Sequence, residues 1–211
     1  MRFEDYRDNL RSKYTEFSNA VAFVLTKAIE GRNQCPKPQQ IQNRAKTPES
    51  LELKLVERNI RTSESIEDQI KDLAGVRPIF YTNLDADGFL ETHLIHENFD
   101  VIDSTIHHPT DQNGKQEYRA IHFVIQLKSN RVALPEYAKF AGMKCEIQVQ
   151  TTVNHAWSEI SHDMLYKAQA TPGFGTAAQK GIERRLKNVM NTYLLPAGYE
   201  IQQIQHDYER L

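Results

Sequence analysis

Apolar residues recur every three or four positions from Phe3 to Glu30, which is the spacing of an amphipathic helix, and Gly31 follows as a stop signal. The next segment, GRNQCPKPQQ, carries two prolines and is predicted to be a loop. A basic approach segment, Arg44–Thr47, leads to a second helix expected over Ser50–Arg58. The chain therefore begins with helices rather than strands.

Four later segments are rich in branched and aromatic residues and are predicted to be β-strands. They lie around 76–82, 99–108, 118–127 and 144–151. A crossover helix is expected between the first two, and a polar loop precedes each of the last two. Further helices are expected over Thr152–Ala168, Ala177–Leu194 and Tyr199–Leu211. The pattern predicts an α/β (α+β) fold in which these four strands form a mixed sheet flanked by helices.

Polar side chains alternate with apolar ones in the last two predicted strands. Glu146 and Gln148 share one face of the segment KCEIQVQT, and Tyr118 and His122 share the polar face of YRAIHFVIQL. For a single strand, a core face and a solvent face explain such alternation. The polar faces of two adjacent strands would together form the floor of a cleft.

Two carboxylates are candidates for a magnesium site. Asp72 leads directly into the first predicted strand, and Glu146 lies in the last. Magnesium prefers hard oxygen ligands and commonly keeps waters and substrate phosphates in its remaining positions. A basic cluster is usually a solvated face, but beside such a pair its cations would counter the charge of a triphosphate. The cations that flank Asp72 are Arg44, Lys46, Arg58, Arg61 and Arg77.

The segment NHAWSEISHDMLYK places His155, Glu159, His162 and Tyr166 on one stripe of a helix. Histidines and a glutamate at this spacing are able to bind zinc, but no recognised zinc motif is present. A structural or substrate-orienting stripe is the preferred interpretation.

The composition is that of an ordinary globular protein: 211 residues, 39% hydrophobic and 26% charged, with a formal net charge of −2. This balance does not point to nucleic acid or an anionic membrane as a partner. Cys35 and Cys145 form no metal or disulfide motif, which fits a reducing cytosol. With neither a secretory signal nor an apolar run of about twenty residues, a cytoplasmic protein is expected.

Four segments occur in an informative order: RAKTPESL, KDLAGVR, EYRAIHFVI, and CEIQVQT followed by HAWSEISHDMLYK. They resemble, in turn, the R-x-K-x-x-x-S segment, the metal-aspartate segment, the G-Y-x-S-I/L-H loop and the E-I-Q-x-R-T strand of the RelA/SpoT synthetase domain, especially in its small, single-domain members. The resemblance divides the chain into an N-terminal helical segment (1–43), a synthetase core with a nucleotidyltransferase-like fold (44–168) and C-terminal helices that pack on or extend the core (169–211).

The resemblance implies roles for particular residues. ATP would be held by Arg44, Lys46, Ser50 and Arg77. Mg²⁺ would be bound by Asp72 and Glu146, and Glu146 would also help to deprotonate the attacking hydroxyl. Tyr118 would stack on the acceptor base, and the rest of the acceptor site would be formed by His122, Gln148, His155, Glu159 and His162.

The implied reaction transfers the β,γ-pyrophosphate of ATP to the 3′-hydroxyl of GDP or GTP, giving (p)ppGpp and AMP. Two positions depart from the family pattern: Glu117 replaces a glycine and Gln150 an arginine. Glu117 would place a negative charge near an anionic acceptor, which keeps a tRNA-modifying toxin open as an alternative. For that alternative, the basic cluster Lys180, Arg184, Arg185 and Lys187 would bind RNA, although a solvated helix face is the preferred reading of the cluster.

A third hypothesis is an inactive nucleotide-binding module that regulates a partner. The hydrolase domain of the long family members has no counterpart in the sequence, so a separate hydrolase or antitoxin partner is compatible with it. The terminal helices are equally compatible with packing on the sheet and with formation of a homo-oligomer.

Overall fold

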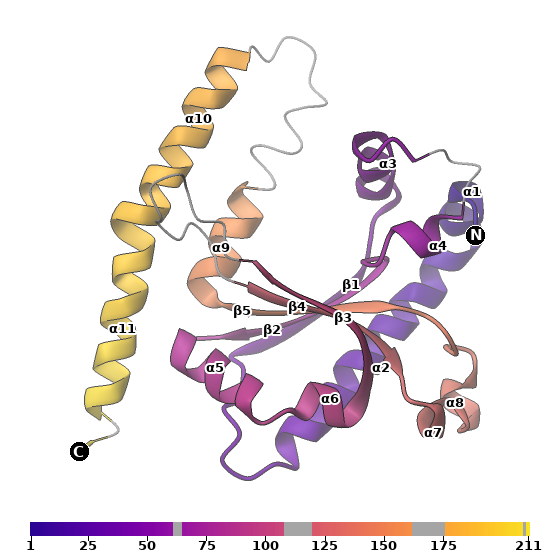
Figure 1. The fold of residues 1–211 in the computed structure, drawn as a ribbon, viewed down its shortest axis with the longest axis horizontal. Helices are drawn as coiled ribbons and strands as arrows, with labels where there is room; N and C mark the ends of the chain where they lie inside the picture. The colour runs from indigo at the N-terminus through magenta and orange to yellow at the C-terminus, as the bar shows by residue number, and fades with distance from the viewer. Residues whose placement is uncertain (61–64, 108–119, 162–175, 209) are drawn as a thin grey trace.

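Five strands form one mixed sheet in the computed structural model, which describes residues 1–60, 65–107, 120–161, 176–208 and 210–211. The strands are β1 (Gln40–Ala45), β2 (Ala74–Phe80), β3 (Phe99–His107), β4 (Ala120–Leu127) and β5 (Cys145–Thr151), in the spatial order β1-β2-β5-β4-β3 (Figure 1). β2 and β5 run parallel, whereas the other neighbouring strands are antiparallel. The predicted mixed sheet flanked by helices is confirmed.

The prediction that four strands make the sheet is wrong, because β1 forms a fifth at one edge. β1 pairs with β2 over its whole length, from Gln40 opposite Ile79 to Ala45 opposite Ala74. Its sequence, QIQNRA, holds only two apolar residues and is mostly half-buried or exposed, as befits an edge strand. Arg44, expected in a segment leading to a helix, therefore stands on a strand.

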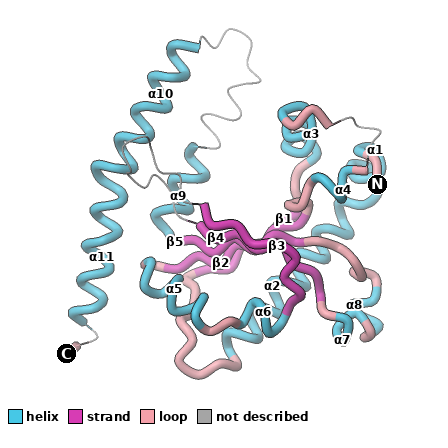
Figure 2. Tube along the Cα trace, viewed as in Figure 1, coloured by secondary structure: helices cyan, strands magenta, loops and turns pink. Residues whose placement is uncertain are grey.

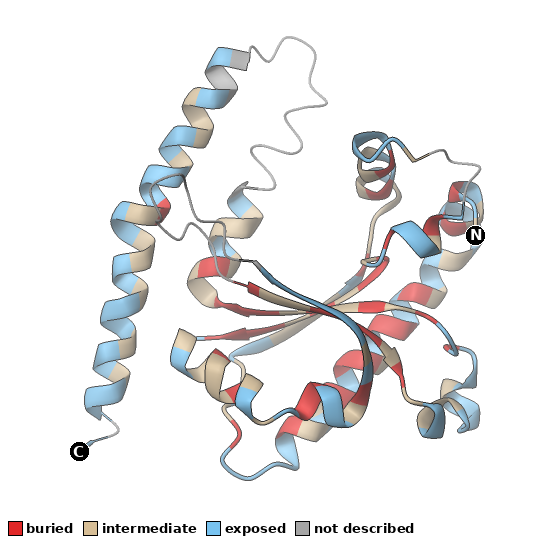
Figure 3. Ribbon diagram, in the orientation of Figure 1, coloured by how far each residue is buried: buried red, intermediate tan, exposed pale blue. Residues whose placement is uncertain are grey.

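The N-terminal residues form one continuous helical stretch that packs under the sheet. It consists of α1 (Phe3–Asp5), the π-helical segment η1 (Tyr6–Leu10) and α2 (Arg11–Glu30), which confirms the helix predicted over these residues. The short helices α5 (Asn83–Glu91) and α6 (Leu94–Asn98) cover the same face of the sheet (Figure 1). Buried residues, red in Figure 3, are concentrated in these helices and in the strands above them; they include Phe17, Leu25, Phe80, Phe89 and Ile125.

The opposite face of the sheet carries α3 (Pro48–Glu57) and α9 (Thr152–Ser161). Figure 2 shows helices on both sides of the strands, with α3 and α9 standing at opposite ends of this second face. Helix α4 (Ile66–Gln69) lies against the N-terminal helical stretch, where the Ile66 N–H donates to the Met1 carbonyl at 3.1 Å. Two short helices, α7 (Ser129–Val132) and α8 (Pro135–Ala138), lie in the connection between β4 and β5. The helix predicted over Thr152–Ala168 is described only as far as Ser161.

The C-terminal helical region is one long rod (Figure 1) made of α10 (Thr176–Val189), the π-helical segment η4 (Met190–Leu194) and α11 (Leu195–Tyr208). The prediction of two helices separated around Pro196 is therefore wrong. Proline has no N–H to continue the helical hydrogen-bond pattern, and the rod changes to a π turn just before it: η4 ends at Leu194, and the Leu195 N–H bonds to the Met190 carbonyl. Gln205 fastens α11 to the start of α5: it accepts a hydrogen bond from Thr82 Oγ1 at 2.9 Å and donates one to Asp85 Oδ1 at 2.8 Å. Across the described parts of the chain, every helix is too short or too polar to span a bilayer.

Candidate functional site

The register of the sheet brings polar residues from several strands onto one face. His122 of β4 lies opposite Gln148 of β5, and Glu146, two residues before Gln148, lies opposite Gly75 of β2. Gly75 in turn lies opposite Arg44 of β1. Because directly opposed residues in neighbouring strands share a face, these side chains belong to one surface, and Gly75 leaves its centre free of a side chain.

This surface is the floor of a cavity of about 390 Å³. The cavity is lined by eight of the residues predicted to form the site: Arg44, Lys46, Ser50, Asp72, Arg77, Glu146, Gln148 and Glu159. Two others, His122 and His155, contact members of this group. The remaining two, Tyr118 and His162, lie outside the described residues, as does Glu117.

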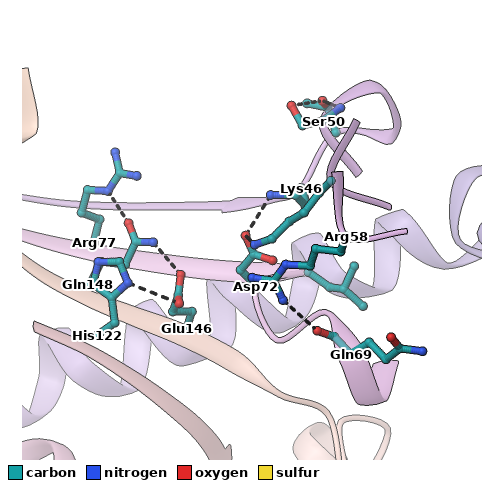
Figure 4. A network of polar contacts seen from close by, with 12 residues as sticks. Lys46, Ser50, Arg58, Gln69, Asp72, Arg77, His122, Glu146 and Gln148 are labelled. Atoms are coloured by element: carbon teal, nitrogen blue, oxygen red, sulfur yellow. Dashed lines mark hydrogen bonds and ion pairs between the residues drawn. The ribbon is translucent and has the colours of Figure 1, made fainter. Parts of the chain in front are cut away.

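Asp72 is held by two lysines. The ammonium groups of Lys46 and Lys54 both lie 2.8 Å from Asp72 Oδ2 (Figure 4 shows the Lys46 contact), and all three side chains are largely buried. Burial alone would raise the pKa of Asp72, but the two ammonium groups outweigh it and lower the pKa to about 2. The second oxygen, Oδ1, is buried without a hydrogen-bond partner among the described residues.

Glu146 is held mainly by hydrogen bonds. Gln148 Nε2 donates to Glu146 Oε2 at 2.6 Å, and His122 Nδ1 lies 3.4 Å from Oε1 (Figure 4). Burial and the nearby Asp72 act to raise the pKa of Glu146, but the His122 and Gln148 contacts prevail and lower it. Both Asp72 and Glu146 are therefore carboxylates at neutral pH.

Arg77 joins β2 to β5 and α9. Its Nε donates to Gln148 Oε1 at 2.9 Å, and its Nη1 lies 2.7 Å from Glu159 Oε1 and 3.1 Å from His155 Nδ1. Burial and the Arg77 charge lower the pKa of His155. Burial acts to raise the pKa of Glu159, but the contact with Arg77 outweighs burial and lowers it. Gln148 thus bridges Arg77 and Glu146, and the stripe on α9, predicted from its spacing, meets Arg77.

Helix α3 contributes Lys54, a site residue that the sequence did not reveal. Thr47 caps α3 by accepting a hydrogen bond from the Ser50 backbone N–H at 3.2 Å, and its hydroxyl donates to Ser50 Oγ at 3.0 Å. Lys54 follows Ser50 by one helical turn, so both stand on the same side of the helix. The four-residue spacing from Ser50 is the sequence feature that places Lys54 beside the predicted ATP-binding residues. Arg58, in contrast, bonds the Gln69 carbonyl (Figure 4).

The chemistry of the carboxylate pair fits magnesium. Asp72 and Glu146 supply ionised oxygens, and the unpartnered Asp72 Oδ1 is a buried acceptor of the kind that a cation satisfies. Within the described ranges, His, Cys, Asp and Glu form no group of three or more that would enclose a metal. A magnesium ion at these residues would therefore complete its coordination with water or substrate phosphates.

A family model described as "Region found in RelA / SpoT proteins" matches residues 43–171, more than half of the chain. The chain belongs to the RelA/SpoT family. The matched region begins within β1, continues through the sheet and includes α9. All the predicted site residues of this RelA/SpoT protein lie within it. No curated protein sequence matches the chain.

Solved structures share the fold of this RelA/SpoT protein over nearly its full length. Small alarmone synthetase 1 from Bacillus subtilis is 18% identical, with a TM-score of 0.75, and the alignment covers 98% of this chain and 100% of that one. The same synthetase bound to its product pppGpp is 19% identical, with a TM-score of 0.68 and 97% of each chain covered. A GTP pyrophosphokinase family protein from Streptococcus pneumoniae is 20% identical, with a TM-score of 0.67, covering 99% of this chain and 95% of that one.

Proposed function

We propose that this protein is a pyrophosphokinase that transfers the β,γ-pyrophosphate of ATP to the 3′-hydroxyl of GDP or GTP. The observation that carries the proposal is the pair of ionised carboxylates, Asp72 and Glu146, in one cavity flanked by Lys46, Lys54 and Arg77. Membership of the RelA/SpoT family and the fold shared with a synthetase bound to pppGpp support the same reaction.

ATP would bind across β1, β2 and α3. Arg44 is exposed at the cavity wall, and the Lys46 ammonium beside Asp72 is placed to meet a phosphate. The guanidinium of Arg77 is fixed by Gln148 and Glu159 and presents a planar cation to the same cavity. Several cations around one cavity offset the charge of a triphosphate and of the leaving phosphate.

The acceptor would bind on the β4 and β5 side of the cavity, next to His122 and Gln148. The 3′-oxygen attacks the β-phosphorus, the bond from that phosphorus to the bridging oxygen of the α-phosphate breaks, and AMP leaves. Glu146, a carboxylate at neutral pH, accepts the proton of the attacking hydroxyl. Magnesium held by Asp72 and Glu146 would supply charge neutralisation and orientation of the phosphates.

The proposal is tested by incubating the protein with magnesium, ATP labelled on its γ-phosphate, and either GDP or GTP. The label should appear in guanosine tetra- or pentaphosphate, with one AMP formed for each transfer. Reactions without an acceptor measure simple hydrolysis. An absence of labelled guanosine product at saturating ATP would refute the proposed acceptor.

A second candidate acceptor is the 3′ CCA end of tRNA, in which case transfer would stop translation and an antitoxin would be the expected partner. The observation in its favour is that Lys180, Arg184 and Lys187 are exposed and spaced by four and three residues along α10, which places them on one stripe. Such a stripe suits an RNA backbone, and binding through it would weaken steeply with added salt.

Deacylated tRNA supplied in parallel with the guanosine nucleotides distinguishes the two acceptors. Label in tRNA alone, lost when the three cations are replaced by glutamine, would favour the tRNA-directed enzyme. Label in the guanosine nucleotide alone, unaffected by those replacements, would favour the alarmone synthetase. Binding of ATP with no transfer to any acceptor would favour an inactive regulatory module.

A further inference from the structure

Tyr6 links the N-terminal helical stretch to the backbone of the site, although it lies far outside the region that matches the family model. Its side chain is fully buried, and its hydroxyl donates a hydrogen bond to the carbonyl oxygen of Lys46 at 2.6 Å. The same hydroxyl lies 3.5 Å from the carbonyl oxygen of Leu73. Lys46 is one of the two lysines that bind Asp72, and Leu73 is the residue after Asp72.

These two backbone carbonyls lie where β1 and β2 come apart. Ala45 and Ala74 are the last paired residues of the ladder, and one further hydrogen bond joins the Lys46 N–H to the Leu73 carbonyl at 2.9 Å. Beyond this hydrogen bond the two segments separate: the one after β1 continues into α3, and the one before β2 comes from α4. The Tyr6 hydroxyl therefore contacts both strand ends beside the last hydrogen bond that joins them.

The π-helical segment η1 explains how Tyr6 reaches this position. Tyr6 and Tyr14 are eight positions apart, which in a regular α-helix would set them about 80° apart around the helix axis. One π turn absorbs an extra residue, so the separation becomes equivalent to about two full turns. The two rings indeed pack together, with centroids 5.5 Å apart. Burial raises the pKa of Tyr6, so its hydroxyl stays protonated and able to donate.

We propose that Tyr6 is a positioning residue that fixes the spacing between Lys46 and Asp72, and so sets the affinity of the site for ATP with magnesium. The inference rests on the proposed function, since it assigns ATP and magnesium to this corner. Tyr6 contacts neither directly. It acts through the backbone of Lys46 and Leu73, while the β4 and β5 side of the cavity is independent of it.

Tyr14 offers a matched control. It is also buried, packs on Tyr6, and its hydroxyl donates a hydrogen bond to Glu67 Oε1 at 2.8 Å. Tyr6→Phe and Tyr14→Phe therefore delete the same atom from neighbouring rings. We expect Tyr6→Phe to raise the KM for ATP and the magnesium concentration for half-maximal rate about tenfold, as the loss of one hydrogen bond allows, and to leave the KM for the acceptor unchanged. Tyr14→Phe should leave all three within about twofold.

Urea unfolding of both variants shows that each is folded, and hydrogen exchange at the Lys46 amide gives a readout that needs no activity. This amide should exchange about tenfold faster in Tyr6→Phe than in Tyr14→Phe, because its bond to Leu73 loses support. Equal exchange in the two variants, or an equal rise in the KM for ATP and for the acceptor, would overturn the proposal. If the unaltered protein transfers no pyrophosphate, the proposed function fails while the exchange rates still decide the role of Tyr6.

Discussion

Asp72 and Glu146 face the same cavity but are kept ionised in different ways (Figure 4). Asp72 receives two ammonium groups on one oxygen and leaves the other without a partner among the described residues. Both oxygens of Glu146 are engaged, one by Gln148 and one by His122. Asp72 is compensated by charge, whereas Glu146 is oriented chiefly by hydrogen bonds.

This difference predicts that the two carboxylates contribute unequally to the free energy of folding and to the rate of the reaction. Removing the charge of Asp72 leaves two partly buried lysines without their counter-ion, which costs folding free energy. Removing the charge of Glu146 leaves no lysine or arginine in the described part of the chain without its counter-ion, because the partners of Glu146 there are Gln148 and His122, so the cost to folding is smaller. Asp72 substitutions should therefore affect folding more, and Glu146 substitutions should affect the reaction more selectively.

The largest expected effect is that of Glu146→Gln on transfer. The amide keeps the size of the side chain but can neither accept the proton nor share a metal as an anion, so kcat should fall about a thousandfold or more. The free energy of unfolding should change by about 1 kcal/mol or less. Single-turnover transfer and urea unfolding measure the two quantities. A variant that retained a tenth of the rate would exclude Glu146 as the proton acceptor.

Asp72→Asn should lower the free energy of unfolding by about 2 kcal/mol at pH 7, which is the value that its depressed pKa corresponds to. The pKa of Asp72 is about 2 in the folded protein, below the usual 3.8. The stabilisation by the Asp72 carboxylate is therefore fully present above pH 3.8 and is lost as the pH falls towards 2. Urea unfolding from pH 7 to pH 2 should therefore show the variant and the unaltered protein converging below about pH 4.

Asp103→Asn is the matched control for this prediction, since Asp103 pairs with Lys71 at the exposed surface. It should leave the free energy of unfolding nearly unchanged. A difference between Asp72→Asn and the unaltered protein that stayed constant down to pH 2 would show that the carboxylate charge is not what stabilises this corner.

The sequence predicted some features of the molecule and missed others. Both carboxylates were predicted, because alternation within β5 and the position of Asp72 before β2 are local patterns. Lys54 was missed because it reaches Asp72 only after α3 folds back over the sheet. β1 was missed because an edge strand with polar residues on both faces lacks alternation, and its pairing with β2 is a long-range property. The rod of α10 and α11 was divided because Pro196 is normally a stop signal, and a π turn is not visible in the sequence.

Arg77→Lys tests the network that links the Glu146 corner to the ATP side. A lysine keeps the charge but has no rigid fork with which to contact Gln148 and Glu159 together. The KM for ATP should rise about tenfold, with a smaller fall in kcat. Arg131→Lys, which alters a contact to Asn98 away from the cavity, is the control and should change neither value. Equal effects of the two substitutions would remove Arg77 from the ATP site.

Glu159→Gln should have the smallest effect, because Glu159 is nearly half exposed, at 45%, and its ion pair with Arg77 is screened by water. The KM for ATP should rise about threefold, corresponding to a fraction of a kcal/mol. If Glu159 acts only by holding Arg77, the substitution should have no further effect in a protein that already carries Arg77→Lys. Additive effects in the double variant, measured as the KM for ATP and for the acceptor, would instead mean that Glu159 contacts a substrate itself, as its place on the predicted acceptor stripe of α9 requires.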